Sequence, residues 1–273
     1  MRRSALTLVV AAVLWAAALP LALRSAWAAD IPVDLELILA VDVSRSMDVD
    51  EQKLQRDGYL AAITHPEVIA AITQGRRGRI ALSYVEWAGP ATQYNVVDWR
   101  AIDGPESAGA FAAQLARAPI QQFRGTSISN GLVFVAPQFD NNGFAATRRV
   151  IDVSGDGPNN MGIPIEPARD AVVGAGITIN GLPIMIKRAG DFTSISNLDV
   201  YYEDCVIGGF GAFTVVVQSA DQFAEAIRRK LVLEIAGREP QIIPQVIPAA
   251  AVASDARMDC LIGEKLREQW MRE

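Results

Sequence analysis

The segment LILAVDVSRSM, residues 37–47, is the most informative about the fold, because an apolar run there ends in short polar side chains. The segment leading into it, residues 33–41, first alternates apolar and polar residues and then becomes wholly apolar. That pattern is typical of a strand buried on both faces. Asp42, Ser44 and Ser46 follow the apolar run at intervals of two, so one turn can aim three oxygen atoms at a single point.

Apolar runs and helical patterns alternate along the rest of the chain. Further strands are expected at residues 79–87, 92–102, 148–153, 177–186 and 212–217, and helices at residues 49–72, 105–116, 127–139, 165–175 and 220–235. Pro66 predicts a kink or break near His65 in the first helix. Strands separated by helices indicate βαβ units. We therefore expect an α/β fold with a doubly wound, mainly parallel sheet, helices on both faces and one antiparallel edge hairpin.

Two further polar loops are expected at the carboxyl edge of this sheet, where open α/β sheets bind ligands. Thr126 stands at the entry to an expected helix, and Asp156 lies in a glycine-rich loop after an expected strand. With the first loop they offer two carboxylates and three hydroxyls, and no sulfur or imidazole. Such hard oxygen donors suit Mg²⁺, Mn²⁺ or Ca²⁺ rather than zinc. Two carboxylates leave some coordination positions of such an ion open. The metal would therefore accept a further carboxylate from outside the chain.

The same three loops carry a family resemblance. LILAVDVSRSM resembles the first-strand motif of von Willebrand factor A domains, an apolar strand followed by Asp-x-Ser-x-Ser. GTSIS (residues 125–129) resembles the threonine loop of that family, and SGDG (residues 154–157) resembles its aspartate-glycine loop. The resemblance covers residues 34–235. It implies a metal-ion-dependent adhesion site formed by Asp42, Ser44, Ser46, Thr126 and Asp156.

At such a site, the resemblance implies that an Asp or Glu side chain of a protein partner completes the coordination of the metal. Gly155 departs from the pattern, because many members of the family have threonine directly before the aspartate. Arg45 would face outward if the neighbouring serines face the metal, and it could steer an acidic partner or be an ordinary solvated arginine. Through ITINGLPI (residues 177–184) and AIRRKLVLEI (residues 226–235), the chain also resembles an exported bacterial group of this superfamily whose function is unassigned.

The first 28 residues predict an export signal. Arg2 and Arg3 precede an uncharged, mostly apolar run at residues 6–19, and Ala26-Trp27-Ala28 fits an A-x-A cleavage pattern. The mature chain would begin near Ala29 and be periplasmic or secreted. If the segment were retained, it would serve as a membrane anchor; without it, no membrane association is expected.

Three parts of the chain are therefore expected: a signal peptide at residues 1–28, the von Willebrand factor A-like domain at residues 29–237, and a tail at residues 238–273. The tail combines a proline-containing linker with a C-terminal helix carrying Cys260. In an oxidising compartment, Cys205 and Cys260 would form a disulfide that ties the tail to the domain; the alternative is two unpaired thiols.

Several classes of function do not fit the sequence. The net charge is −6 and no Lys/Arg block stands out, which argues against a nucleic-acid partner. No G-x-G-x-x-G follows the first strand and no Walker A pattern occurs, so no small-molecule cofactor is expected. His65 is the single histidine and lies far in sequence from any plausible nucleophile, which argues against Ser-His-Asp or Cys-His chemistry.

The sequence therefore favours a divalent-metal-dependent protein-binding module, not an enzyme. One alternative is a metal-assisted phosphohydrolase that uses Asp42 as its nucleophile. Phosphatases of the haloacid dehalogenase type need a second aspartate two residues later, and this chain has Ser44 there. The other alternative is a structural component of an envelope assembly, in which the metal serves only stability and the terminal helix docks.

Overall fold

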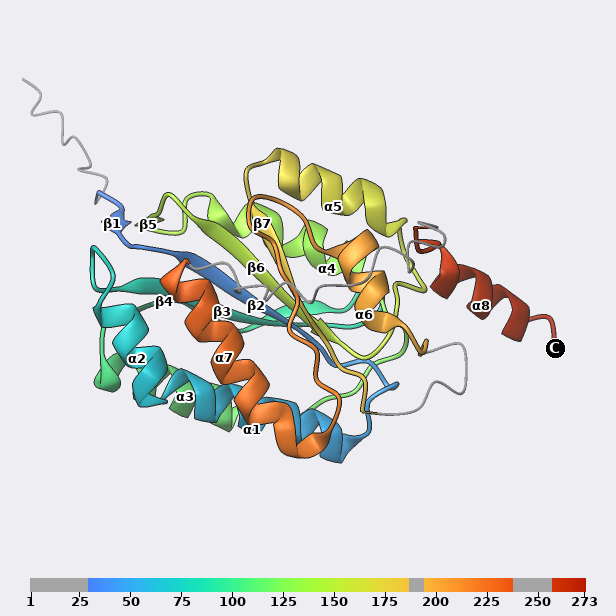
Figure 1. Ribbon diagram of the computed structural model, residues 1–273, viewed down its shortest axis with the longest axis horizontal. Coiled ribbons are helices and arrows are strands. Elements are labelled where there is room, and N and C mark those ends of the chain that lie inside the picture. The colour runs from blue at the N-terminus through green and yellow to red at the C-terminus, as the bar shows by residue number, and fades with distance from the viewer. Residues whose placement is uncertain (1–28, 187–193, 238–256) are drawn as a thin grey trace, which may run out of the picture.

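The computed structural model describes residues 29–186, 194–237 and 257–273. The predicted signal segment, residues 1–28, and residues 238–256 of the predicted linker lie outside the described residues. A sheet with the strand order β4-β3-β2-β6-β7 forms the centre of the domain (Figure 1). Its strands are β2 (Glu36–Asp42), β3 (Ile80–Trp87), β4 (Gln93–Ile102), β6 (Arg149–Gly155) and β7 (Thr178–Pro183).

The pairing of these strands confirms the predicted fold class. Strand β2 is parallel to both of its neighbours, β3 and β6, and β7 is parallel to β6. Strand β4 is antiparallel to β3 and forms the expected edge hairpin. Two short strands, β1 (Ile31–Pro32) and β5 (Phe144–Ala145), pair separately from the main sheet.

Helices cover both faces of the sheet, as Figure 1 shows. The helices on one face are α1 (Val49–Ile63), α2 (Pro66–Thr73), α3 (Pro105–Arg117) and α7 (Phe223–Ala236). Those on the other face are α4 (Ile128–Val135), α5 (Ile165–Gly174) and α6 (Leu198–Tyr201). Because side chains alternate along a strand, Leu37 and Leu39 of β2 pack in the first layer while Ile38 and Ala40 pack in the second. The continuous apolar run therefore serves two cores.

Two predicted helices are divided. The break expected near His65 is present, because the His65 side chain accepts a hydrogen bond from the Glu67 N–H (3.2 Å) and caps α2. The helix predicted over residues 127–139 is α-helical only to Val135. It continues as a 3-10 turn, Ala136–Phe139, which contains Pro137. Proline in a helix removes a hydrogen-bond donor and so favours such a change.

The strand predicted over residues 212–217 is not continuous. This segment runs parallel to β7 and pairs with it only at two isolated bridges, Gly181 with Thr214 and Ile184 with Val217. One hydrogen bond of the expected ladder is missing. The Val217 N–H donates to the Pro183 carbonyl (3.0 Å), but Pro183 has no N–H with which to donate to the neighbouring segment. The proline therefore interrupts what would otherwise be a sixth strand.

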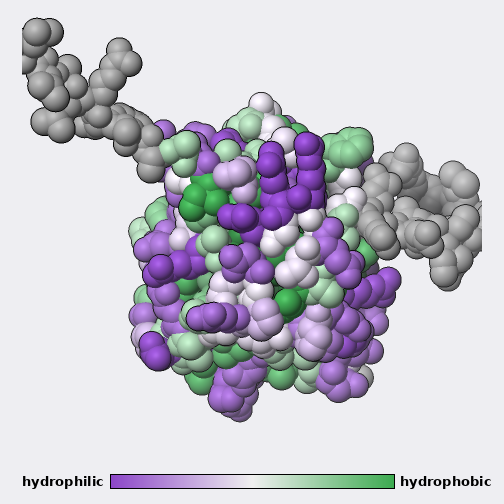
Figure 2. All heavy atoms as spheres, turned by 90° about the vertical axis from the view of Figure 1, so that its left-hand side faces the viewer, coloured by the Kyte–Doolittle hydropathy of each residue, from purple (hydrophilic) through white to green (hydrophobic). Residues whose placement is uncertain are grey.

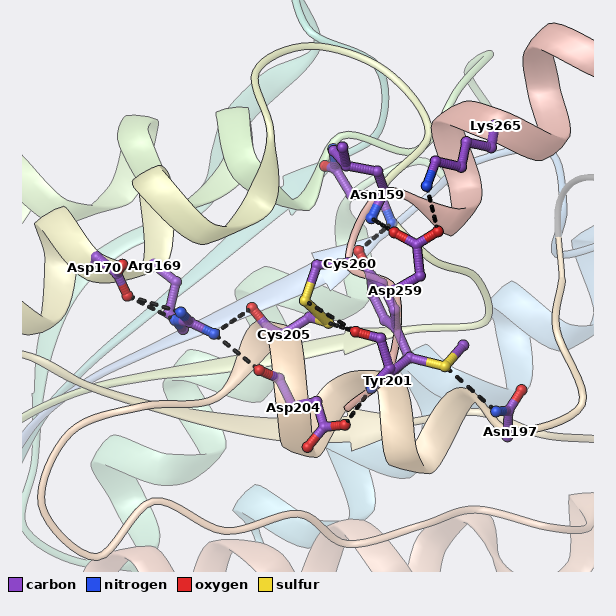
Figure 3. Close-up of a disulfide and its surroundings, with 12 residues drawn as sticks. Asn159, Arg169, Asp170, Asn197, Tyr201, Asp204, Cys205, Asp259, Cys260 and Lys265 are labelled. Carbon is purple, nitrogen blue, oxygen red and sulfur yellow. Dashed lines mark hydrogen bonds and ion pairs between the residues drawn. A yellow bond between two sulfur atoms is a disulfide. The ribbon is translucent and has the colours of Figure 1, made fainter. Parts of the chain in front are cut away.

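The C-terminal segment folds back onto the domain. Its helix, α8 (Ile262–Trp270), lies at the right of Figure 1, beyond the ends of β2 and β6. Cys260 precedes this helix instead of lying within it, which corrects the prediction, and it forms a disulfide with Cys205 (Figure 3). None of the helices in the described ranges is long and apolar enough to cross a membrane. The opposite end of the domain, seen in Figure 2, has a largely hydrophilic surface with scattered apolar residues.

Candidate functional site

The candidate site begins where β2 ends. The Asp42 side chain is fully buried there, and its Oδ1 accepts a hydrogen bond from the Ser44 N–H at 2.7 Å. The Ser44 and Ser46 hydroxyl oxygens lie 2.7 Å apart, and the Ser46 hydroxyl donates to Oδ1 of Asp156 at 2.5 Å. A continuous row of side chains therefore joins the loop after β2 to the loop after β6. The spacing of two in Asp-x-Ser-x-Ser places all three side chains on one side of the turn.

The two carboxylates in this row make the site electrostatically unfavourable on its own. Burial, and then the charge of Asp156, raise the pKa of Asp42 well above its usual range, although hydrogen bonds from Ser44 oppose the rise. The second oxygen of Asp42, Oδ2, is buried and has no hydrogen-bond partner among the described residues. An unpaired buried carboxylate oxygen is costly. A cation between the two loops would compensate both the repulsion and the missing partner.

Thr126 is brought to the same place by the segment that precedes it. Phe123 pairs with the loop after β2: its N–H donates to the Val43 carbonyl at 3.0 Å, and its carbonyl accepts from the Arg45 N–H at 2.8 Å. Thr126 is buried, and its N–H donates to the side-chain oxygen of Asn160 at 3.0 Å. The threonine loop is thus held between the two carboxylate-bearing loops.

All five predicted ligands therefore meet at one edge of the sheet. Within the described part of the chain, no group of three or more His, Cys, Asp or Glu side chains could hold a metal ion. The candidate site instead combines two carboxylates with three hydroxyls, a set that fits a hard divalent cation better than zinc. Asp42, Ser44, Ser46, Thr126 and Asp156 would hold the ion. When bound, it would supply positive charge and an open coordination position for an anionic group.

The surroundings of Gly155 explain why this chain has glycine where many members of the family have threonine. A side-chain carbon at position 155 would lie 3.0 Å from Asp42 Oδ2 and 3.0 Å from the Tyr202 hydroxyl. Tyr202 is fully buried, and its hydroxyl has no hydrogen-bond partner in the described chain. Burial and the charges of Asp42 and Asp156 raise its pKa well above the ordinary value. Tyr202 therefore occupies space that a residue larger than glycine at position 155 would need.

Three neighbours of the site were missed by the sequence reasoning. Tyr202 lies far along the chain, at the end of a segment (residues 192–202) that the sequence suggests is loop and short helix, where no motif marks it. Asn159 and Asn160 directly follow the aspartate-glycine loop, and this Pro-Asn-Asn run was an available signal. The Asn160 side chain holds Thr126, whereas the side-chain oxygen of Asn159 accepts from the N–H and hydroxyl of Ser129, both at 3.1 Å. Both asparagines tie the loop after β6 to the start of α4.

A pocket of about 520 Å³ opens beside these residues. Its lining includes Ser44, Ser46 and Thr126, and it also includes the exposed side chain of Arg45. The predicted partner-contacting arginine thus stands at the pocket and not on a remote face. The remaining lining residues are Arg124, Gly125, Asn160, Met161, Arg267 and Trp270.

The strand order and the helices on both faces give this chain the fold of von Willebrand factor A domains. Solved structures with the same fold include a von Willebrand factor type A protein from Catenulispora acidiphila, 15% identical with a TM-score of 0.54, where the match covers 75% of this chain and 43% of that one. Proximal thread matrix protein 1 from the mussel byssus, in a structure with a zinc-occupied MIDAS motif, is 13% identical with a TM-score of 0.52. That match covers 76% of this chain and 49% of the mussel protein. The pilus adhesin SpaC from Lactobacillus rhamnosus GG is 13% identical with a TM-score of 0.54, and the match covers 76% of this chain and 31% of SpaC.

This chain matches about half of the mussel protein's length and less of the other two. The sequence model of a family described as "Protein of unknown function (DUF1194)" matches residues 32–239, and the chain belongs to that family. No curated protein matches the sequence.

Proposed function

We propose that this chain is an exported protein-binding module that uses one divalent metal ion to bind a carboxylate of its partner. The observation that carries the proposal is the buried Asp42, whose Oδ2 has no partner while its charge lies close to that of Asp156. A folded protein tolerates such an arrangement when a cation completes it. Ser44, Ser46 and Thr126 supply neutral oxygens, so the site retains affinity for a further negative group.

The comparisons support this reading in general terms. The mussel protein has a zinc-occupied MIDAS motif and SpaC is a pilus adhesin, and both share the fold of this chain. For this chain we propose Mg²⁺, with Mn²⁺ or Ca²⁺ as alternatives, because every donor is oxygen. The disulfide between Cys205 and Cys260 supports a periplasmic or secreted location, because such bonds persist in oxidising compartments.

We further propose that the site binds without catalysis. The position where a phosphohydrolase of the haloacid dehalogenase type needs its second aspartate is Ser44, which donates its N–H to Asp42. A panel of phosphate esters assayed with Mg²⁺ should show no turnover above that of the Asp42→Asn variant. Turnover that disappears in this variant would make the chain an enzyme and overturn this part of the proposal.

The binding proposal is tested by crosslinking the mature chain in an envelope extract and identifying its crosslinked partners by mass spectrometry. The crosslink should form in Mg²⁺ and disappear in EDTA and in the Asp42→Ala variant. Asp140→Asn is a matched control, because the Asp140 side chain is 68% exposed and pairs with Arg149 at the start of β6. A partner retained equally by the wild type and Asp42→Ala would contradict a role for the metal in binding.

A further inference from the structure

We infer that α8 forms one wall of the partner-binding pocket, and that Arg45, Arg124 and Arg267 select an acidic segment of the partner with more than one carboxylate. In this arrangement one carboxylate reaches the metal and its neighbours pair with the arginines. The inference rests on the proposed function and extends it to the chemistry of the partner.

The pocket is built from four separate segments. Ser44, Arg45 and Ser46 come from the loop after β2, residues 124–126 precede α4, and residues 160–161 follow β6. The fourth segment is α8, which contributes Arg267 and Trp270. The pocket next to the candidate metal ligands is therefore completed by a helix that comes more than one hundred residues after the last of them.

The charge of this lining is opposite to that of the whole chain. The net charge of the chain is −6, yet the pocket lining contains three arginines and no Asp or Glu. Arginine pairs with carboxylates through two parallel hydrogen bonds and keeps its charge at all relevant pH values. A concave site with one sign of charge attracts ligands of the opposite sign and disfavours others. The chemistry that fits is a run of acidic side chains.

Met161 and Trp270 add an apolar part to the same lining. Trp270 is 59% exposed, a high value for the most bulky side chain in proteins, and Met161 is partly buried. Tryptophan and arginine are the residues that most often dominate the energy of protein interfaces. The pocket therefore suits a peptide segment, whose backbone and apolar carbons can contact these two side chains, better than a small inorganic anion.

The position of α8 is set by several contacts with the domain. The disulfide joins Cys260 to Cys205, and the Met258 N–H donates to the Asp204 carboxylate at 2.7 Å. Figure 3 shows Asp204 and Cys205 of the domain beside Cys260 of the tail. Such contacts hold the wall of the pocket before the partner arrives, which lowers the entropic cost of binding.

The helix itself contacts the loop that carries Asp156. The Asn159 side-chain amide donates to Oε1 of Glu264 at 2.7 Å. Gly263 packs so closely against this loop that a side-chain carbon there would clash with the Asn159 backbone oxygen. A bulkier residue at position 263 must therefore move α8 away from the site without altering any charge in the pocket.

The test uses the full mature chain and two fluorescein-labelled dodecapeptides of glycine and serine. One peptide has a single central glutamate, and the other has two more glutamates beside it. With saturating Mg²⁺, we expect fluorescence polarisation to show at least about tenfold tighter binding of the three-glutamate peptide. Arg267→Gln and Gly263→Val should each remove most of this difference, whereas calorimetry should show unchanged Mg²⁺ affinity. Arg272→Gln is the control, since the Arg272 side chain is 81% exposed and outside the lining.

The outcomes separate this inference from the proposed function. Mg²⁺-dependent binding of both peptides with equal affinity, or an Arg267→Gln variant that keeps the preference, overturns the role of α8 and leaves the metal site intact. If Mg²⁺ binds but the three-glutamate peptide does not, the acidic segment as ligand is also overturned. Peptide binding that persists in EDTA, or absence of Mg²⁺ binding, contradicts the proposed function itself.

Discussion

The Ser46 hydroxyl lies 2.5 Å from Oδ1 of Asp156, although 110 positions separate the two residues in the chain. This hydrogen bond joins the ends of two adjacent parallel strands, β2 and β6, so the loops that follow them share one set of oxygen atoms. The sheet therefore determines which polar side chains meet. The charge of Asp156 acts on the buried Asp42 carboxyl, and this proximity of two carboxylates favours the proposed cation.

The metal-free protein should become more stable when one of these charges is removed. Asp42→Asn keeps the shape of the side chain and abolishes the repulsion with Asp156. We expect a Tm in EDTA that is about 2–4 °C higher, equivalent to about 1 kcal/mol for a domain of this size. Added Mg²⁺ should raise the Tm of the wild type but not of this variant. A variant that melts below the wild type in EDTA would show that the charge is already compensated.

Tyr202→Phe should be neutral or stabilising. The Tyr202 hydroxyl is buried without a hydrogen-bond partner in the described residues, and leaving such a group unsatisfied costs about 1–3 kcal/mol. Urea denaturation should therefore give an unfolding free energy equal to or about 1 kcal/mol above that of the wild type. Phe223→Leu, at another fully buried aromatic residue, is a control that should lose stability. A loss of more than 1 kcal/mol for Tyr202→Phe would mean that the hydroxyl has a partner.

Removal of the disulfide should release the tail and weaken the domain. The bond between Cys205 and Cys260 closes a separation of 55 residues, which corresponds to about 4 kcal/mol in the chain-entropy model. Hydrogen exchange in Cys205→Ala/Cys260→Ala should show faster exchange throughout α8, while β2 and β6 remain protected. Protection of α8 equal to that of the wild type would show that Met258, Gly263 and Glu264 suffice to hold the helix.

A buried charge cluster between β6 and α7 should make stability depend on pH. Lys230 contacts both Asp152 and Glu234, and all three are buried. Burial, with the charge of Glu234, raises the pKa of Asp152 to about 7 despite the opposing effect of Lys230. The folded state then binds a proton more tightly than the unfolded state does, so this group lowers stability as pH rises between about 4 and 7.

Asp152→Asn should remove that dependence. Urea denaturation at several pH values should give a wild-type unfolding free energy whose fall across this window exceeds that of the variant by at least about 1.4 kcal/mol, the value of one pKa unit. Asp140→Asn, which alters an exposed ion pair, is the control and should follow the wild type. Parallel curves for the wild type and Asp152→Asn would show that Asp152 stays ionised throughout.

The alternation of apolar strands and helices was sufficient to predict the sheet and the meeting of its polar loops. Asp42, Ser44 and Ser46 follow a strand buried on both faces at intervals of two. Their position at the carboxyl end of the sheet, where ligands bind, could therefore be predicted from local spacing. The strand expected at residues 212–217 was predicted as continuous, because its interruption depends on the N–H that Pro183 lacks in a different segment. Tyr202 and Arg267 reach the site through tertiary packing, which no periodic pattern reports.

The direction of the tail helix, α8, also could not be predicted from the sequence. The cysteine pair predicts that residues 205 and 260 meet, but not where the following helix points. That direction depends on the missing side chain of Gly263 and on the contact between Asn159 and Glu264. These contacts become apparent only after the loop that follows β6 has been placed.

The most direct test of the central claim is a calorimetric titration of Mg²⁺ into the mature chain and into Asp156→Ala. The wild type and Asp140→Asn should each show one saturating site, and Asp156→Ala should show none. Binding of Mg²⁺ to Asp156→Ala with wild-type affinity would contradict the assignment of Asp42, Ser44, Ser46, Thr126 and Asp156 as a single metal site.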